Sequence, residues 1–567
     1  MLFFVLNYNN MNVNDKNMTK KVHNNNIEQY FPFDTFRPYQ KEILNKIVKD
    51  FENGTKVVIL DGPVGFGKSP VNIALGDYFK PSFYTTPQVK LVNQLSKDFC
   101  PKKLAIDGGY GDCIAFLGRR NYRCRETGLD SDICPYRTGV QVEDDFGRIK
   151  KKTCSKMENC TYQKQKEAAS ESNIAILTFA MLIINSYLNY FPKRNLLIID
   201  ECHNLENQVA NLFAGFTISF KILPKSFGEE LREKIWKEDI EEYLPNSRQI
   251  EDYLPFFMKF KELTTKWRPL CQNERDLDKL RNLSRRIKNI LEEIEEGRIW
   301  TVNLTYYGEY NSRIPRLFSP ILIDKFLQEK LWRQANKIIL SSATIPYRNN
   351  VVKWLERIGL NDKAFKFHSV PMTFPIENRK IITAYMNGKM TYNEEKKNWN
   401  ANINSIKSII KKHGSEKGVI HTQSYSRAKK LYDDLKGYNL FLHKEKVSES
   451  IIDQWVNSKK QILVSPSIKD GVDLKDDLCR FQILLKIPYP NIKNARVDYL
   501  LNKKKDWVWY NEETTRDIIQ MYGRAIRSST DYATFYIIDS SFNNLPKRNF
   551  PDWFLKALPE NRIKNNE

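Results

Sequence analysis

Residues 61–69 read Asp61-Gly62-Pro63-Val64-Gly65-Phe66-Gly67-Lys68-Ser69, and this stretch decides the fold. The apolar run at 57–60 before it predicts a short buried β-strand, and residues 71–75 after it can begin a helix. A glycine, four further residues and then Gly-Lys-Ser, placed between a strand and a helix, match a phosphate-binding P-loop. The glycines let backbone N–H groups converge on an anion, and the helix N-terminus adds the positive end of its dipole. We therefore expect a nucleoside triphosphate at this loop.

The residue types of the loop suggest roles for individual positions. Lys68 can reach the β- and γ-phosphates of ATP, and the hydroxyl of Ser69 can hold Mg²⁺. The alternative is a glycine-rich turn without a ligand, but the preceding strand and the Lys-Ser pair favour the P-loop. The expected nucleotide contacts here are Gly62, Gly65, Gly67, Lys68 and Ser69.

Composition narrows the class of protein. The chain has 567 residues, of which 41% are hydrophobic, enough for several cores. Its formal charge of +22 favours a polyanionic partner, with nucleic acid as the first candidate and an anionic membrane surface as the competitor. No segment approaches the ~18 apolar residues that span a bilayer, so we expect a soluble intracellular protein without a membrane partner. Nine cysteines are too few for a disulfide scaffold and are expected to be reduced.

The chain alternates strand-like and helix-like segments in two regions. The pattern at 36–99 returns at 174–200, and a second region begins near residue 346, so we expect an α/β protein with parallel sheets. Residues 101–165 interrupt the first region and are rich in Cys, Gly and Arg. Apolar residues at three- and four-residue steps from 277 to 294 predict a long helix, which we interpret as part of a helical hairpin.

A second catalytic element follows the apolar run at 196–199. Asp200 at the end of a strand can hold Mg²⁺ through water, and Glu201 can polarise the water that attacks the γ-phosphate. A lone Asp-Glu pair is otherwise a solvated turn. Together with the P-loop, the pair is better explained as a Walker B box.

Asp200-Glu201-Cys202-His203 resembles the DEAH-type box of superfamily two helicases, and further boxes of that superfamily follow in order. Similar to them are the adenine-reading element Arg37-Pro38-Tyr39-Gln40, motif Ia at Thr85-Thr86-Pro87 with Gln94, motif III at Ser341-Ser342-Ala343-Thr344, motif IV at His421-Thr422-Gln423-Ser424, motif V at Asp470-Gly471-Val472-Asp473, and motif VI at residues 520–527.

The resemblance implies how the two regions share one site. Arg524 and Arg527 would be arginine fingers that neutralise charge on the transferring phosphoryl group. Because they lie far along the chain from the P-loop, the two half-sites must meet across a cleft, as in a motor. Further nucleotide-site residues implied by the boxes are Arg37, Gln40, His203, Asp473, Gln520 and Gly523.

Four cysteines of the interrupting segment, Cys124, Cys134, Cys154 and Cys160, are candidate metal ligands. Their spacing lacks the short knuckles of zinc sites, and thiolates suit either zinc or an iron–sulfur cluster. Their location between the P-loop and the Walker B box resembles the XPD/DinG-like branch of superfamily two, where four cysteines hold a 4Fe–4S cluster. Cys113 and Cys100 are nearby substitutes for one ligand.

Other residues near the cysteines and in the second region have two interpretations. Arg119, Arg120, Tyr122 and Arg123 are either the point where duplex meets a wedge or a solvated basic loop. The aromatic residues Tyr306, Tyr307, Trp507, Trp509 and Tyr510 are more often core than base-stacking groups.

The resemblance implies an α/β fold with two RecA-like P-loop domains, the first carrying an iron–sulfur insertion and a helical arch. The expected divisions are a disordered leader (1–33), RecA-like domain 1 (34–100, 166–205 and 300–345), the iron–sulfur insertion (101–165), the arch (206–299), RecA-like domain 2 (346–545) and a tail (546–567).

The implied activity is that of a monomeric ATP-dependent DNA helicase. It would move 5′ to 3′ on single-stranded DNA and unwind forks. The alternatives are a DNA-stimulated translocase or remodelling ATPase that leaves strands paired, and a switch whose grip on nucleic acid depends on bound ATP.

Overall fold

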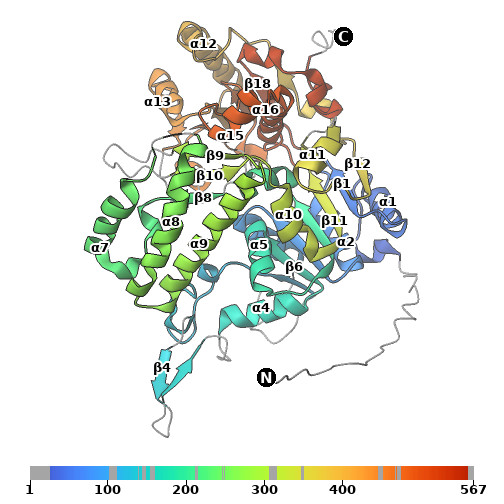
Figure 1. Ribbon diagram of the computed structural model, residues 1–567. Helices are drawn as coiled ribbons and strands as arrows, with labels where there is room; N and C mark the ends of the chain where they lie inside the picture. Colours follow the sequence, from blue (N-terminus) through green and yellow to red (C-terminus); the bar gives the residue numbers. More distant parts are fainter. Residues whose placement is uncertain are drawn as a thin grey trace, which may run out of the picture.

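The computed structural model describes most of the chain: residues 26–100, 112–137, 140–143, 149–153, 160–210, 215–245, 247, 249–304, 316–346, 350–444, 451–466, 468, 474 and 476–559. Two parallel β-sheets flanked by helices dominate it, so the expected α/β class is confirmed (Figure 1). In the described part of the chain, every helix is too short or too polar to span a bilayer.

The first sheet has seven strands, all parallel. In spatial order they are β12 (Phe365–Ser369), β1 (Val57–Asp61), β11 (Ala335–Ser342), β7 (Arg194–Asp200), β2 (Ser82–Thr86), β6 (Ile174–Thr178) and β3 (Cys113–Ala115). The central strands are apolar on both faces because helices cover both. β11 lies between β1 and β7, so the P-loop and the Walker B box leave the same edge one strand apart.

Two helical layers enclose this sheet. Alternate residues of β1 enter separate cores: Val58 and Leu60 pack with one layer, Val57 and Ile59 with the other. The first layer consists of α1 (Gln40–Glu52), α2 (Lys68–Tyr78) and α3 (Val89–Phe99). The second includes α4 (Thr161–Glu171), α5 (Phe179–Leu188), α6 (Leu205–Gln208), α10 (Asp324–Lys330) and α11 (Val351–Arg357).

The second sheet has six parallel strands. Their order is β13 (Ile381–Ile382), β18 (Thr534–Ile537), β17 (Phe481–Leu484), β14 (Gly418–His421), β16 (Ile462–Ser465) and β15 (Leu440–Leu442). The helices in this part of the sequence are α12 (Glu395–His413), α13 (Tyr425–Asp434), α14 (Ile451–Asn457), α15 (Ala495–Asp498), α16 (Trp507–Tyr522) and α17 (Asp552–Leu555).

The expected helical hairpin forms a body with its own core. It contains α7 (Gly228–Ile235), a π-helical turn at Trp236–Glu241, α8 (Leu254–Lys266) and α9 (Glu274–Glu295). The apolar face of α9 buries Leu280, Ile287 and Ile290 in that core. A three-stranded antiparallel sheet closes its base, with β10 (Arg316–Pro320) between β8 (Phe216–Ile218) and β9 (Trp300–Leu304). The body therefore extends beyond the expected end at residue 299.

Two further strands lie in the cysteine-rich segment. β4 (Val140–Glu143) and β5 (Ile149–Lys152) form an antiparallel hairpin that projects away from the sheets (Figure 1). A disulfide joins Cys100 to Cys113, so the expectation that every cysteine is reduced is wrong for this pair. Cys100 ends α3 and Cys113 begins β3, which places their Cα atoms 5.2 Å apart.

Three boundaries differ from the expected ones. Residues 27–30 form a 3₁₀ helix, with Ile27 and Phe31 buried against the first core, so the expected leader at 1–33 includes packed structure. β12 pairs with β1 although it lies beyond residue 345, so the first sheet extends to Ser369. In the expected tail, Phe550 and Phe554 are buried in the second unit. In each case a few apolar residues without periodicity are held by long-range contacts.

Arg194, at the start of β7, is a buried arginine that sequence analysis did not single out. Its guanidinium donates to Ser82 O at 2.9 Å, Ser172 O at 2.8 Å and Ser170 O at 3.0 Å, and also to Ala169 O. Three of these carbonyls close the C-terminal end of α4, where a positive charge is favourable. Burial lowers the pKa of Arg194 to about 10.

Replacing Arg194 by Met should lower the free energy of unfolding by about 3–5 kcal/mol, because buried carbonyls lose their donor. Urea denaturation measures the change. The exposed Arg333 is the matched control, and Arg333→Met should cost less than about 0.5 kcal/mol. An Arg194→Met loss as small as that of the control would contradict this account.

Candidate functional site

The P-loop connects β1 to α2 in the geometry expected for a phosphate cradle. Gly65 and Gly67 have positive φ angles of 80° and 81°. A Cβ at Gly65 would lie 2.1 Å from the ring of Phe374, so only glycine fits there. Lys68 begins α2 and donates to Gly62 O at 3.1 Å, which curls its ammonium back over the loop.

Arg37 and Gln40 brace the P-loop from α1 and the turn before it. Arg37 Nη1 donates to Gly65 O at 2.6 Å, and Gln40 Nε2 donates to Phe66 O at 2.9 Å and Gly67 O at 3.1 Å. Gln40 Oε1 accepts from Arg37 N at 2.7 Å. Both Nε2 and Oε1 of Gln40 are thus hydrogen-bonded within the protein. That Gln40 recognises adenine stays a prediction.

Asp200 and Glu201 leave the same edge of the sheet one strand away, where Asp200 is buried and Glu201 is half-buried near Lys68. Tyr84 Oη donates to Asp200 Oδ2 at 2.8 Å. Burial and the charge of Glu201 raise the pKa of Asp200 to about 6, although Lys68 and Tyr84 act in the opposite direction. Burial also opposes ionisation of Glu201, but His203, Lys68 and the two motif VI arginines outweigh it and lower its pKa.

A chain of hydrogen bonds runs from His203 to motif VI. His203 Nδ1 lies 2.8 Å from Ser342 Oγ and 3.4 Å from Glu201 Oε2. Ser342 Oγ accepts from Thr344 N at 3.0 Å, and Thr344 Oγ1 accepts from Gln520 Nε2 at 2.7 Å. Burial lowers the pKa of His203 to about 3.

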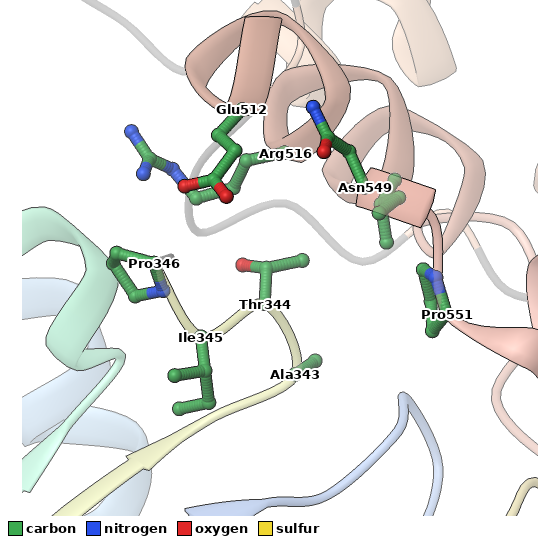
Figure 2. Close-up of a pocket in the computed structure, with 9 residues that line it drawn as sticks. Ala343, Thr344, Ile345, Pro346, Glu512, Arg516, Asn549 and Pro551 are labelled. Carbon is green, nitrogen blue, oxygen red and sulfur yellow. The ribbon is translucent and has the colours of Figure 1, made fainter. Parts of the chain in front are cut away.

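Motif VI meets the first sheet at this point. Thr344 faces Glu512 and Arg516 of α16 across a cavity of about 30 Å³ (Figure 2). Arg524 Nη2 donates to Gln520 Oε1 at 3.2 Å. A Cβ at Gly523 would lie 2.5 Å from Val64 Cγ2, so the end of α16 packs directly on the P-loop.

The structure brings most of the expected nucleotide residues together. The P-loop, Asp200, Glu201 and His203 lie beside Gln520 and Gly523, and Arg524 and Arg527 are near enough to affect Glu201. Asp473 lies outside the described residues. The site also includes Tyr84, Ser342 and Phe374. Of these, only Ser342 could have been assigned a role from the sequence, because it lies inside motif III.

The candidate cluster ligands are described in part. The thiols of Cys124 and Cys134 hydrogen-bond to each other. Thr161, which follows Cys160, donates from Oγ1 to Arg123 O at 2.7 Å and so ties Cys160 to the Cys124 segment. Cys154 lies outside the described residues. Among the residues that are described, no three metal-ligating side chains form a group. The disulfide removes Cys100 and Cys113 as substitutes.

The expected contact residues beside these cysteines are partly used within the fold. The Arg119 guanidinium lies 4.1 Å from the ring centroid of Tyr162, and Tyr122 Oη accepts from Leu117 N at 3.0 Å. Arg120 and Arg123 are exposed. In the second region Trp509 and Tyr510 are buried while Trp507 is exposed. Tyr306 and Tyr307 lie outside the described residues.

Two protein-family models match parts of the chain. The DEAD_2 family model matches residues 123–223, and the helicase C-terminal domain model matches residues 406–561. Both models support the resemblance to the XPD/DinG-like branch of superfamily two helicases.

Sequence relatives of this XPD/DinG-like chain are similar over short stretches. ATP-dependent DNA helicase chl1 of Schizosaccharomyces pombe is 24% identical over 143 residues, 21% of this chain and 17% of the relative. A regulator of telomere elongation helicase 1 homolog of Caenorhabditis briggsae is 30% identical over 105 residues, 16% of this chain and 11% of the relative. The matched part is thus less than a fifth of either relative.

Solved structures share the fold over nearly the whole chain. The structure titled XPD_Helicase has a TM-score of 0.60 at 16% identity and covers 92% of this chain and 98% of its own. The Xpd4 structure of S. tokodaii has a TM-score of 0.51 at 16% identity, with 90% and 99% covered. The two-sheet architecture is therefore that of XPD.

Tyr84→Phe should lower the apparent affinity for Mg²⁺ in ATP hydrolysis by about 10–100-fold, because Asp200 loses the hydroxyl that orients it. A Mg²⁺ titration of the ATPase rate measures this. Tyr253→Phe is the matched control, since its hydroxyl also makes buried bonds, to Pro245 O and Ser247 O, but in the distant helical body. Equal metal affinity in Tyr84→Phe and wild type would exclude an orienting role.

Proposed function

We propose that this protein is an ATP-dependent DNA helicase that moves 5′ to 3′ on single-stranded DNA and separates duplexes and forks. The observation that carries the proposal is the meeting of two half-sites. Lys68 and Glu201 of the first unit lie near Arg524, which follows α16, and Thr344 of the first unit accepts from Gln520 of α16. A site divided between two units suits a motor, since nucleotide binding closes the units and hydrolysis releases them.

The proposed roles follow from position. Lys68 and the P-loop N–H groups hold the triphosphate, and Ser69 with Asp200 holds Mg²⁺. Glu201 has a lowered pKa and is therefore ionised at neutral pH, as a residue that orients the attacking water must be. Arg524 and Arg527 stabilise charge on the transferring phosphoryl group. Arg37, Gln40, His203, Asp473, Gln520 and Gly523 complete the proposed nucleotide site.

The proposal of DNA as the substrate has two supports. A formal charge of +22 favours a polyanion, and the Schizosaccharomyces pombe relative is named as an ATP-dependent DNA helicase. The helical body around α7–α9 is the proposed arch, and the segment with β4 and β5 is the proposed iron–sulfur insertion. Polarity and strand separation are proposed from the family resemblance.

Wild-type protein should unwind a 5′-tailed duplex but not a 3′-tailed one, and single-stranded DNA should stimulate its ATPase. Lys68→Ala should lower ATP hydrolysis about 10²–10³-fold, because the γ-phosphate loses its cation. Strand separation and phosphate release are the measurements, and Lys49→Ala on the exposed face of α1 is the control.

Each failure of this assay has its own meaning. An ATPase that ignores single-stranded DNA would refute the motor. Stimulated hydrolysis without strand separation would leave only a translocase or remodelling ATPase. Unwinding from 3′ tails alone would reverse the proposed polarity.

The cysteines fit the proposed 4Fe–4S cluster in their chemistry, since Cys124 and Cys134 are adjacent and Cys160 is tied to the same segment. With Cys154 they would hold the cluster, which would cross-link the insertion. Protein purified without oxygen should contain about four iron atoms per chain and absorb broadly in the visible.

Cys124→Ser should remove most of that iron, while Cys271→Ser in the helical body should retain it. Metal analysis and the visible spectrum give the result without any activity assay. Zinc in place of iron, or no metal in the wild type, would contradict the cluster.

A further inference from the structure

A buried ion cluster lies outside the nucleotide site, on the helix that follows the Walker B box. Glu206 on α6 accepts from Arg357 of α11 and from Arg496 of α15. Their side chains are only 12%, 8% and 6% exposed. Burial opposes ionisation of Glu206, but the two arginines outweigh it and lower its pKa to about 2. Such a cluster is costly to break, because a lost partner leaves a buried charge uncompensated.

Arg496 makes two further contacts with the first unit. Its Nη1 donates to Asn207 Oδ1 at 3.2 Å and its Nη2 to Ile321 O at 3.2 Å. The neighbouring Ala495 N donates to Asn303 Oδ1 of β9 at 2.6 Å. α15 is thus held between the Walker B helix and the small sheet at the base of the arch.

The chain that follows α15 is fixed to the same unit. Leu500, Leu501 and Trp509 are buried in the apolar core formed with the first sheet. Asp506 accepts from Trp509 N at 3.1 Å and so caps α16, and Lys353 of α11 contacts both of its carboxylate oxygens at 3.1 Å.

The other end of α16 carries the proposed arginine fingers. α16 has 16 residues and therefore spans about 24 Å from its anchored start to Tyr522. Arg524 and Arg527 follow directly. Because a helix is stiff over this length, the seat of its first turn sets where the guanidinium groups arrive at the P-loop.

We infer that Glu206 and Arg496 are positioning residues for the arginine fingers: their buried ion pair seats the start of α16 on the first unit. The inference rests on the proposed ATPase, since it assigns these residues a role in that site. Neither residue touches the nucleotide in this account; both act through α16 on Arg524 and Arg527. The fingers matter most when charge develops on the phosphoryl group, so loosening their support should affect the transition state more than the ground state.

Arg496→Met should weaken binding of ADP–aluminium fluoride, which resembles the transition state, by about 10–100-fold, while leaving the affinity for fluorescent ADP unchanged. Both affinities are measured by fluorescence titration with Mg²⁺ and without DNA. A merely structural defect would reduce the fraction of competent protein but would not separate the two affinities. Arg496→Lys, which keeps the charge but not the forked donors, should lie between Met and wild type.

Arg232→Met is the control, because the largely covered Arg232 pairs with the exposed Glu229 inside the helical body, away from α16. It should bind both ligands as wild type does. If Arg496→Met proves unstable, Glu206→Gln tests the same contrast. Equal weakening of both ligands, or no weakening of either, would overturn the inference. Failure of the tailed-duplex assay would refute the helicase proposal alone, because these titrations contain no DNA.

Discussion

Asp200 is buried at the end of β7 with the half-buried Glu201 beside it, and the site depends on how the charge of these two carboxylates is compensated. Burying ionised groups is costly unless opposite charges lie close. Lys68 supplies one such charge from the start of α2 in the same unit, and the motif VI arginines supply others from the second unit. The electrostatic requirement of one strand end therefore holds two units together and aligns both halves of the nucleotide site.

The order of strands in the first sheet makes this compensation possible. β1 and β7 are separated only by β11, so the P-loop, the Walker B box and motif III leave the sheet side by side. Ser342 and Thr344 lie at the end of β11 and connect His203 on one side to Gln520 on the other. Motif III thus joins the two half-sites through hydrogen bonds that exist only while the units are in contact.

The motifs could be predicted from sequence because their residue types are fixed by local chemistry. A P-loop needs glycines with positive φ and a lysine at one spacing, and buried parallel strands need continuous apolar runs. The supporting residues carry no such signature. Arg194 became a buried cap for α4 through the fold alone, and Tyr84 reaches Asp200 from a neighbouring strand. β12 was not predicted because it too lacks a sequence signature: an edge strand with half-exposed side chains has no apolar run.

The expected domain limits failed where segments of one unit are held by the other. Leu500, Leu501 and Trp509 lie between strands of the second sheet in the sequence, yet they are buried in the core of the first. A boundary drawn by the alternation of strands and helices assigns them wholly to the second unit. Their packing means that α16 belongs to both units: its start rests on the first, and its end packs against β17 and β18 of the second. A helix shared in this way ties the placement of motif VI to the packing between the units, which is the mechanical property that a divided nucleotide site requires.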